Sequence, residues 1–362
     1  MTTEIKSSNN AVNLPWQSLK TFTASITLSE KVWRVVNNLL FVAACLGLCA
    51  TMSRHTRLAS SAASSPAFSY VAYAVIALAI RRIISMVIGY AAYHAPWSLP
   101  RTLLMRAETF EHEDLLKRGF IIQRISLHKS GVTYDARIIG HKDTIANGKW
   151  SIHALGNFSA MELETSAISI HNKATGANTL LVNGPGVGHS KGYPTRHQMG
   201  AGFEAGIQFL EKEVKATHIA MQGVSLGGGM MAEAILAHQF DTSRVKYLST
   251  SECTFSRLSD IAATFVPFIA TAACFLTGAE LDGVLAAEKL KKLGIKHIII
   301  QHQSKDNKGT DGVIPDRVAL APALKKGPTR TFLLSPDIKH GGLPLTIQKN
   351  LLEKLQKFFE QA

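Results

Sequence analysis

The sequence predicts an α/β protein whose mostly parallel sheet is covered by helices on both faces. From residue 119 onward, short apolar runs of strand length alternate with segments of helical spacing. A serine flanked by glycines stands between one such run and a helical segment. A long apolar region precedes these elements, so we expect an added helical region before the sheet.

The composition narrows the class of protein. The chain has 362 residues, of which 46% are hydrophobic and 18% charged, so it can bury a sizeable core and is not disordered. Its net charge of +13 comes from Lys and Arg residues that are spread along the chain, without a basic run or a zinc-finger signature. We therefore expect no nucleic-acid partner and favour an anionic membrane surface.

The four cysteines form no metal-type pair. Cys45 and Cys49 lie inside an apolar run, and Cys253 and Cys274 stand far apart in the chain. None has the CxxC spacing of a zinc or redox site. We predict buried thiols and no metal.

The first third of the chain divides by composition into a polar segment, residues 1–32, and an apolar helical region, residues 33–100. In the apolar region, residues 35–52 are almost uncharged, and eighteen residues is the lower end of what spans a bilayer. A second apolar stretch, residues 67–80, ends at Arg81-Arg82 and is shorter than a span requires.

The topology of this apolar region stays open. A transmembrane helix or membrane hairpin, a re-entrant segment, and an interfacial helix flanked by Tyr90, Tyr93 and Trp97 all fit the pattern. A helical subdomain packed against the rest of the chain fits it as well. We favour membrane association over the packed subdomain.

Residues 101–362 are predicted to form one α/β domain. Alternation of apolar and polar positions predicts paired strands at 119–127 and 131–140. Short apolar runs predict further strands at 178–182, 218–222, 245–250, 295–301 and 330–334. Helical spacing predicts helices at 196–215, 230–239 and 345–360.

The strongest functional signal is the sequence Gly223-Val224-Ser225-Leu226-Gly227 between a predicted strand and a predicted helix. A serine in such a tight turn exposes its hydroxyl above the sheet, and the glycines leave room for the close packing of the turn. The helix aims its first N–H groups at the site, where an oxyanion would form. We predict Ser225 as a nucleophile and Leu226 as an oxyanion donor.

A serine nucleophile needs a base, and the base needs an acid to orient it. His340 follows the last predicted strand in the sequence Lys-His-Gly-Gly, and we predict it as the base. Asp311 follows the strand at 295–301 in Asp-Gly-Val-Ile-Pro, and it is our first candidate for the acid. Asp306 and Glu252 remain open as alternatives.

A glycine-rich loop, residues 183–189, follows the predicted strand at 178–182. Glycines permit the unusual dihedral angles of a loop whose backbone N–H groups bind an oxyanion. We therefore predict Gly186 or Val187 as the second oxyanion donor. His189 and His197 flank this loop and are kept as further candidates.

These motifs carry a family resemblance. Residues 119–362 resemble the α/β-hydrolase superfamily of serine hydrolases through GVSLGG, TDGVIP and KHGG in this order, although Asn183 stands where the family loop begins with His-Gly. The apolar N-terminal third and the NGPGVGHS loop are similar to the CHLPS-type proteins of chlamydiae and related intracellular bacteria. This resemblance implies an α/β-hydrolase fold and a hydrolase of unassigned substrate that acts in or on a host cell.

The function expected from these residues is hydrolysis of carboxylic esters by Ser225, His340 and Asp311 without a cofactor. An apolar insertion near residues 255–290 is expected to form a helical cap over the site, which favours lipid or acyl esters. A serine peptidase, a thioesterase and a catalytically inactive binding or scaffolding protein are the alternatives. We expect membrane association, at a host-cell membrane or the bacterial inner membrane, with the catalytic domain in the cytosol.

Overall fold

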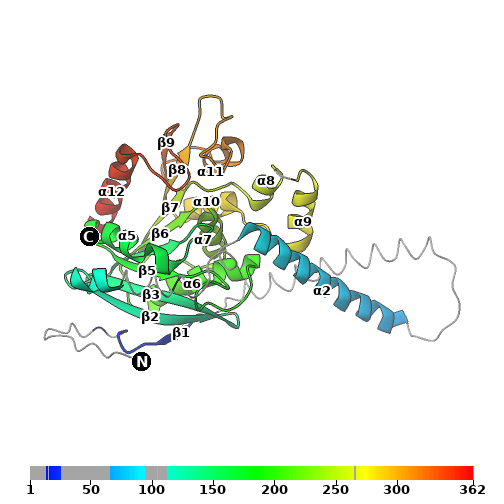
Figure 1. Cartoon of the computed structure of the whole chain (residues 1–362), viewed down its shortest axis with the longest axis horizontal. Coiled ribbons are helices and arrows are strands. Elements are labelled where there is room, and N and C mark those ends of the chain that lie inside the picture. Colours follow the sequence, from blue (N-terminus) through cyan, green and yellow to red (C-terminus); the bar gives the residue numbers. More distant parts are fainter. Residues whose placement is uncertain are drawn as a thin grey trace.

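A computed structural model describes residues 14, 16–25, 66–93, 104, 112–264 and 266–361. In this part of the chain, nine strands form one sheet in the order β1-β2-β3-β5-β4-β6-β7-β8-β9 (Figure 1). The strands are β1 (Thr21–Thr23), β2 (Phe120–Lys129), β3 (Val132–His141), β4 (Lys149–Ala154), β5 (Asn178–Val182), β6 (His218–Val224), β7 (Lys246–Glu252), β8 (Lys296–His302) and β9 (Arg330–Ser335).

Helices cover both faces of this sheet. The helices with described bounds, including those that lie beyond the sheet faces, are α2 (Pro66–Ala92), α5 (Met161–Ala174), α6 (Arg196–Lys212), α7 (Leu226–Ala237), α8 (Leu258–Ala262), α9 (Ile269–Thr277), α10 (Gly283–Lys292), α11 (Leu320–Ala323) and α12 (Leu345–Glu360). The apolar side of α12 packs against Leu248 and Ile298. Residues of α6 and α7 share a core with Ile152 and Ile219.

The sheet is mostly parallel, as the sequence predicts. From β5 through β4 and β6 to β9 every neighbouring pair is parallel, and only β2–β3 and β3–β5 are antiparallel. Strands buried on both faces have short, nearly continuous apolar runs, which is why β5 and β8 are visible in the sequence. The carboxyl ends of these parallel strands meet at one edge, where the predicted site residues follow.

Two strands lie where the sequence analysis placed none. β4 (Lys149–Ala154) inserts between β5 and β6, so the strand that precedes the glycine-rich loop is not the neighbour of the serine strand. β1 lies within the polar segment of residues 1–32 and pairs with β2. Its neighbour Trp16 is buried edge-on against Trp150, which anchors this segment to the core.

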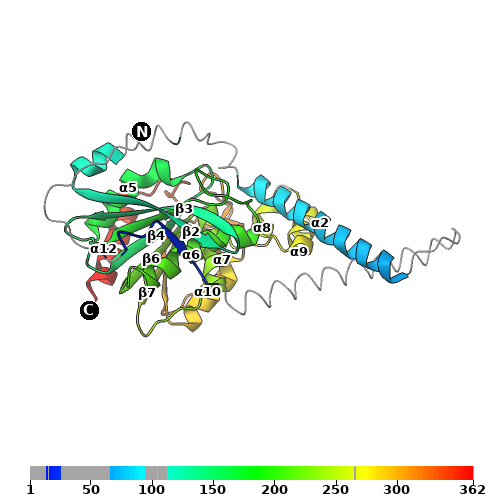
Figure 2. The same cartoon turned by 90° about the horizontal axis from the view of Figure 1, so that it is seen from below.

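α2 extends away from the sheet in both views (Figures 1 and 2). It continues through Arg81, because this side chain is buried and its Nε donates to the carbonyl oxygen of Thr277 at 3.3 Å, at the end of α9. Near its other end, a Cβ on Gly89 would lie 1.6 Å from the carbonyl oxygen of Pro194, so helix and loop are in backbone contact. α2 is therefore docked on the domain at two points.

The membrane expectations meet this structure only in part. Residues 35–52 and Trp97 lie outside the described residues, as does the side chain of Tyr90. Tyr93 is not an interfacial aromatic, because it is 2% exposed and packs against Gly184. Among the described helices, none is long and apolar enough to cross a membrane.

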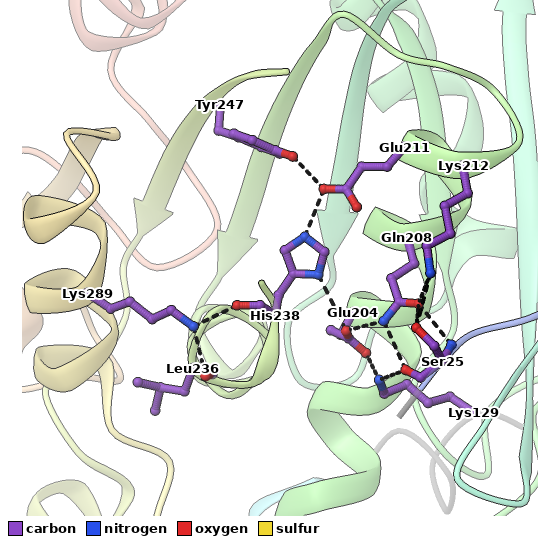
Figure 3. A network of polar contacts seen from close by, with 10 residues as sticks. All are labelled: Ser25, Lys129, Glu204, Gln208, Glu211, Lys212, Leu236, His238, Tyr247 and Lys289. Atoms are coloured by element: carbon purple, nitrogen blue, oxygen red, sulfur yellow. Dashed lines mark hydrogen bonds and ion pairs between the residues drawn. The ribbon is translucent and has the colours of Figure 1, made fainter. Parts of the chain in front are cut away.

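A buried polar network joins α6 to its neighbours (Figure 3). Lys129 of β2 forms an ion pair with Glu204 of α6, and its Nζ donates to the carbonyl oxygen of Ser25 at 2.9 Å. His238, just after α7, lies 3.4 Å from Glu204 and 2.8 Å from Glu211. Because these groups are shielded from water, removing one partner leaves an uncompensated buried charge.

The network predicts a pH dependence of stability. Burial alone lowers the pKa of His238, but its hydrogen bonds to Glu204 and Glu211 outweigh burial and raise it. The contribution of His238 is then fully present below its unfolded pKa of about 6.5 and is lost as the pH rises through the raised folded value. We expect the difference in unfolding free energy between wild type and His238→Gln to be larger at pH 6 than at pH 9, measured by urea denaturation.

His218 supplies the control for this measurement. Burial is the main cause that lowers its pKa, so the wild-type advantage over His218→Gln should grow with rising pH. The same trend in both variants would contradict the role assigned to the network.

Candidate active site

Ser225 lies in a strained turn between β6 and α7. Its backbone angles are φ 53° and ψ −123°, outside the regions that side chains prefer. A Cβ on Gly227 would lie 2.0 Å from the carbonyl oxygen of Ala154, and one on Gly223 would lie 2.8 Å from the Cα of Gly228. Gly227 therefore allows the start of α7 to touch the end of β4, and Gly223 allows the same start to fold back closely on β6.

Glu252 at the end of β7 and Thr254 just after it hold the strained serine from the other side. The Ser225 N–H donates to the carbonyl oxygen of Glu252 at 2.8 Å. The Thr254 hydroxyl donates to the carbonyl oxygen of Ser225 at 2.8 Å. Both polar backbone groups of the serine are thus fixed, and its side chain is left to face the carboxyl edge of the sheet.

His340, in the turn after β9, contacts the serine directly. Its Nε2 lies 2.9 Å from Ser225 Oγ, and its Nδ1 lies 2.9 Å from Asp311 Oδ2. The backbone N–H of His340 also donates to the carbonyl oxygen of Asp311 at 2.7 Å. The structure therefore brings together the three side chains that the sequence analysis selected, in the geometry of a serine–histidine–acid relay.

Asp311 is held as a carboxylate. Its Oδ1 accepts the backbone N–H groups of Val313 at 2.9 Å and Ile314 at 2.7 Å. Burial by itself raises the pKa of Asp311, but the hydrogen bonds from His340 and these two N–H groups outweigh burial and lower it. An ionised Asp311 can fix the Nδ1–H tautomer of His340 and stabilise its protonated form.

Neither rival acid is hydrogen-bonded to His340 in the described part of the chain. Asp306 is exposed in the loop after β8, where it accepts from Ser304 and from the backbone N–H of Lys308. Glu252 stands at the end of β7 beside the serine, but no hydrogen bond joins its carboxyl group to His340 in the described structure. Asp311 is the carboxylate that contacts the histidine.

Gly186 and Val187 are not brought to Ser225, contrary to the sequence prediction. The glycine-rich loop follows β5, and β4 separates β5 from β6. The loop beside the serine is instead the one after β4, where a Cβ on Gly156 would lie 3.5 Å from the Cβ of Ser225. The sequence signal for β4, Lys149–Ala154 followed by Leu-Gly-Asn, was missed because polar residues interrupt its apolar run.

The glycine-rich loop has a structural role. Asn183 Oδ1 accepts the backbone N–H of Met161 at the start of α5, and its Nδ2 donates to Glu162 at 2.9 Å. The backbone N–H of His189 donates to Asp135 at 3.2 Å, and His197 Nε2 lies 3.2 Å from the Ser130 hydroxyl. These contacts join the loop, α5 and the antiparallel strands, so neither histidine belongs to the site.

Leu226, the other predicted oxyanion donor, lies at the right place. It is the first residue of α7 and directly follows the serine. The first N–H groups of a helix have no partner within the helix and carry the positive end of its dipole. Its backbone N–H can therefore face a developing negative charge beside Ser225.

Two cavities meet at Ser225 and His340. One has a volume of about 550 Å³ and apolar walls from the helices above the site, among them Ile88 of α2, Ile261 of α8 and Cys274 of α9. The other has a volume of about 500 Å³ and is here called the polar cavity, because His153, Glu164 and Glu252 give it more polar walls than the first. The predicted cap insertion thus contributes α8 and α9 to the apolar cavity, and α2 completes it.

Metal binding at this site is disfavoured by the chemistry of its side chains. Among the described residues, one group of side chains, Cys253, Asp311 and His340, has ligand atoms within 4.8 Å of one another. Asp311 and His340 already bond to each other. Burial, together with nearby Glu252 and Asp311, raises the pKa of the Cys253 thiol, which keeps it protonated and a poor ligand.

Solved structures share this fold. An α/β-hydrolase from Vibrio vulnificus is similar with a TM-score of 0.50 and 17% sequence identity, over 69% of this chain and 84% of that one. An esterase from Pyrococcus furiosus is similar with a TM-score of 0.47 and 12% identity, over 68% of this chain and 92% of that one. At 17% identity the likeness to the Vibrio vulnificus structure shows the fold alone, and the fold is that of the α/β-hydrolases.

The family follows from the sequence. The family model described as Chlamydia CHLPS protein (DUF818) matches residues 109–337, more than half of the chain. The chain therefore belongs to the CHLPS family, which confirms the resemblance seen in its motifs. The sequence has no significant match among curated proteins.

The close contact between Gly227 and the carbonyl oxygen of Ala154 predicts an effect on stability. Gly227→Ala would place a Cβ against the Ala154 carbonyl, and we expect it to lower the free energy of unfolding by about 1–3 kcal/mol. Urea denaturation of the purified protein measures the loss. Gly327→Ala is the matched control, because a Cβ there meets nothing within 4 Å. Equal stability of the two variants would refute the tight contact.

Proposed function

We propose that this protein is a serine hydrolase that cleaves carboxylic esters with Ser225, His340 and Asp311 as its catalytic residues. The observation that carries the proposal is the continuous relay from the serine hydroxyl through both ring nitrogens to a buried carboxylate. The relay opens onto two cavities large enough for the two halves of an ester. A family of hydrolase fold supports the same class of reaction.

The reaction proceeds by acyl transfer. Ser225 Oγ attacks the ester carbonyl while His340 Nε2 takes the hydroxyl proton, and the carbonyl electron pair moves onto oxygen. His340 then returns the proton to the leaving alcohol as the C–O bond breaks. Water, deprotonated by the same nitrogen, releases the acid and restores Ser225. Asp311 holds the ring through both steps.

The oxyanion would be held by backbone donors from two elements. Leu226 supplies one N–H at the start of α7. The turn after β4, at Gly156 and Asn157, supplies the second, because it lies against the serine where the glycine-rich loop does not. Donors fixed in advance by a helix and a strand end stabilise developing charge without reorganisation.

The apolar cavity favours a long acyl group. Its walls from α2, α8 and α9 offer a hydrocarbon chain a site away from water. Each buried methylene is worth about 0.8 kcal/mol, so binding should strengthen with chain length. Esters of medium or long acyl chains, including lipid esters, are therefore the expected substrates. Thioesters have the same acyl group and react by the same acyl transfer, so they are the alternative substrate class.

The activity test is hydrolysis of p-nitrophenyl octanoate by the full-length protein. Ser225→Ala should lower kcat/KM by about 10³-fold or more, because the three residues act as a unit. His340→Ala should cost nearly as much and Asp311→Asn somewhat less. The octanoate should also be cleaved faster than the acetate.

Asp306→Asn serves as the control and should keep wild-type activity, because Asp306 is an exposed loop residue away from the relay. Circular dichroism checks that each variant is folded. Equal residual activity in wild type and Ser225→Ala would reject the enzyme and favour a binding or scaffolding protein.

A lipid surface is the proposed place of action. Ile76, Ile80, Ile83 and Val87 form one exposed stripe of α2, with Ile83 60% and Val87 61% exposed. Phe268, which is 89% exposed, stands beside α9, the helix that contacts α2. The same helices wall the apolar cavity, and the net charge of +13 complements an anionic membrane.

Liposome sedimentation tests this proposal. Full-length protein should sediment with vesicles that contain about 30% phosphatidylserine. The double variant Ile83→Glu and Phe268→Glu should lower the bound fraction several-fold, because it buries fewer apolar groups in the membrane. Leu345→Glu, on an exposed apolar residue of α12, is the control. Unchanged binding of the double variant would remove this surface from the proposal.

A further inference from the structure

The polar cavity beside Ser225 is not explained by the acyl group. It shares Ser225, His340 and Asn157 with the apolar cavity and continues past Gly341 and Gly342, on the far side of the histidine. His340 Nε2 must reach the oxygen of the leaving alcohol to protonate it. When the acyl chain fills the apolar cavity, the polar cavity is the space that remains for the alcohol.

The charges of this cavity are of one sign. Two carboxyl groups, Glu164 and Glu252, line it, and among its described lining residues there is no Lys or Arg. Its two other histidines carry no charge near neutral pH: burial, helped by His171, lowers the pKa of His153 to about 3, and burial also lowers the pKa of His171. Above the pKa of Glu252, which burial raises to about 7, this wall is anionic and favours a cation, although the chain as a whole has a net charge of +13.

Of these two acidic residues, Glu252 is the one that contacts Ser225, through its main chain. It ends β7, and its carbonyl oxygen accepts the N–H of Ser225, which fixes its position relative to the nucleophile. No hydrogen bond or ion pair joins its side chain to another residue in the described part of the chain. Glu164, in contrast, accepts a hydrogen bond from Ser159 at 2.8 Å. Glu252 is therefore the carboxyl group available to a ligand.

The surroundings of Glu252 suit a charged partner. Burial raises its pKa to about 7, against a smaller opposing effect of His340. A cation placed beside the group would favour its ionised form and form a strong contact in a site with little water. Ile168, Leu343 and Leu351 line the same cavity and can pack against the methylene or methyl groups of the cation.

We propose that the polar cavity binds the alcohol half of the ester and that Glu252 selects an alcohol that carries a positive charge, such as an amino alcohol or a quaternary ammonium alcohol. This inference rests on the proposed function, because Ser225 must be the nucleophile. It adds the class of the leaving group and a residue that determines specificity.

The test compares two esters that differ in charge alone. Hexanoylcholine and 3,3-dimethylbutyl hexanoate have the same acyl chain and nearly the same shape, but only the first has a cationic alcohol. At pH 8, above the pKa of Glu252, we expect wild type to show a kcat/KM about tenfold higher for hexanoylcholine. In Glu252→Gln the ratio should fall to about one.

Asp306→Asn, which removes an exposed acid outside the cavity, should keep the wild-type ratio and is the matched control. A wild-type ratio near one would overturn the proposal. So would an equal loss for both esters in Glu252→Gln, because that result assigns the carboxyl group to His340 rather than to the alcohol.

A second measurement separates this inference from the proposed function. Inactivity toward p-nitrophenyl octanoate would reject the hydrolase, whereas the binding of the cation needs no turnover. Calorimetry of hexanoylcholine with full-length Ser225→Ala, with and without Glu252→Gln, measures the contact itself. Equal dissociation constants in the two variants would reject the anionic site.

Discussion

The backbone contact between the start of α7 and the end of β4 is the constraint on which the site depends. With no Cβ on Gly227, the helix approaches Ala154 closely enough to force Ser225 to a positive φ of 53°. That turn sets the serine hydroxyl at the carboxyl edge of the sheet, where loops from β8 and β9 deliver the acid and the histidine. The same contact brings the 155–158 turn to the serine, so one close approach aligns the nucleophile and the adjacent backbone donors.

The sequence was sufficient for residues whose role depends on local chemistry. Ser225 needs its two glycines, and Asp311 and His340 follow apolar strands in the order expected of the fold. The second oxyanion donor depends instead on which strands are neighbours. β4 has a Lys, a Ser and a His among its six residues, so it has no clear strand pattern. Its place between β5 and β6 depends on contacts between residues far apart in the sequence. Trp16 in the polar N-terminal segment is similar, because only its contact with Trp150 makes it a core residue.

The described part of the N-terminal apolar region, helix α2, lines the cavity at Ser225. Ile88, Ala91 and Ala92 of α2 line the cavity that reaches Ser225, and Asn157 Nδ2 donates to the carbonyl oxygen of Ala92 at 3.0 Å. Arg81 joins the same helix to the end of α9. The boundary that the sequence analysis placed at residue 100 therefore divides segments that line the same cavity. Composition cannot reveal this, because it does not show which segments lie side by side in the fold.

Glu252 accepts the N–H of Ser225 with its main-chain carbonyl oxygen and is one of the residues that line the polar cavity. Every amino acid has the main-chain carbonyl oxygen that accepts the N–H of Ser225. A substitution of Glu252 therefore need not disturb the strained turn at Ser225. A substitution at this position can thus change the groups that line the cavity while the contacts among Ser225, His340 and Asp311 stay intact. Position 252 can in this sense change its chemistry alone, whereas Ser225, Asp311 and His340 depend on their contacts with one another.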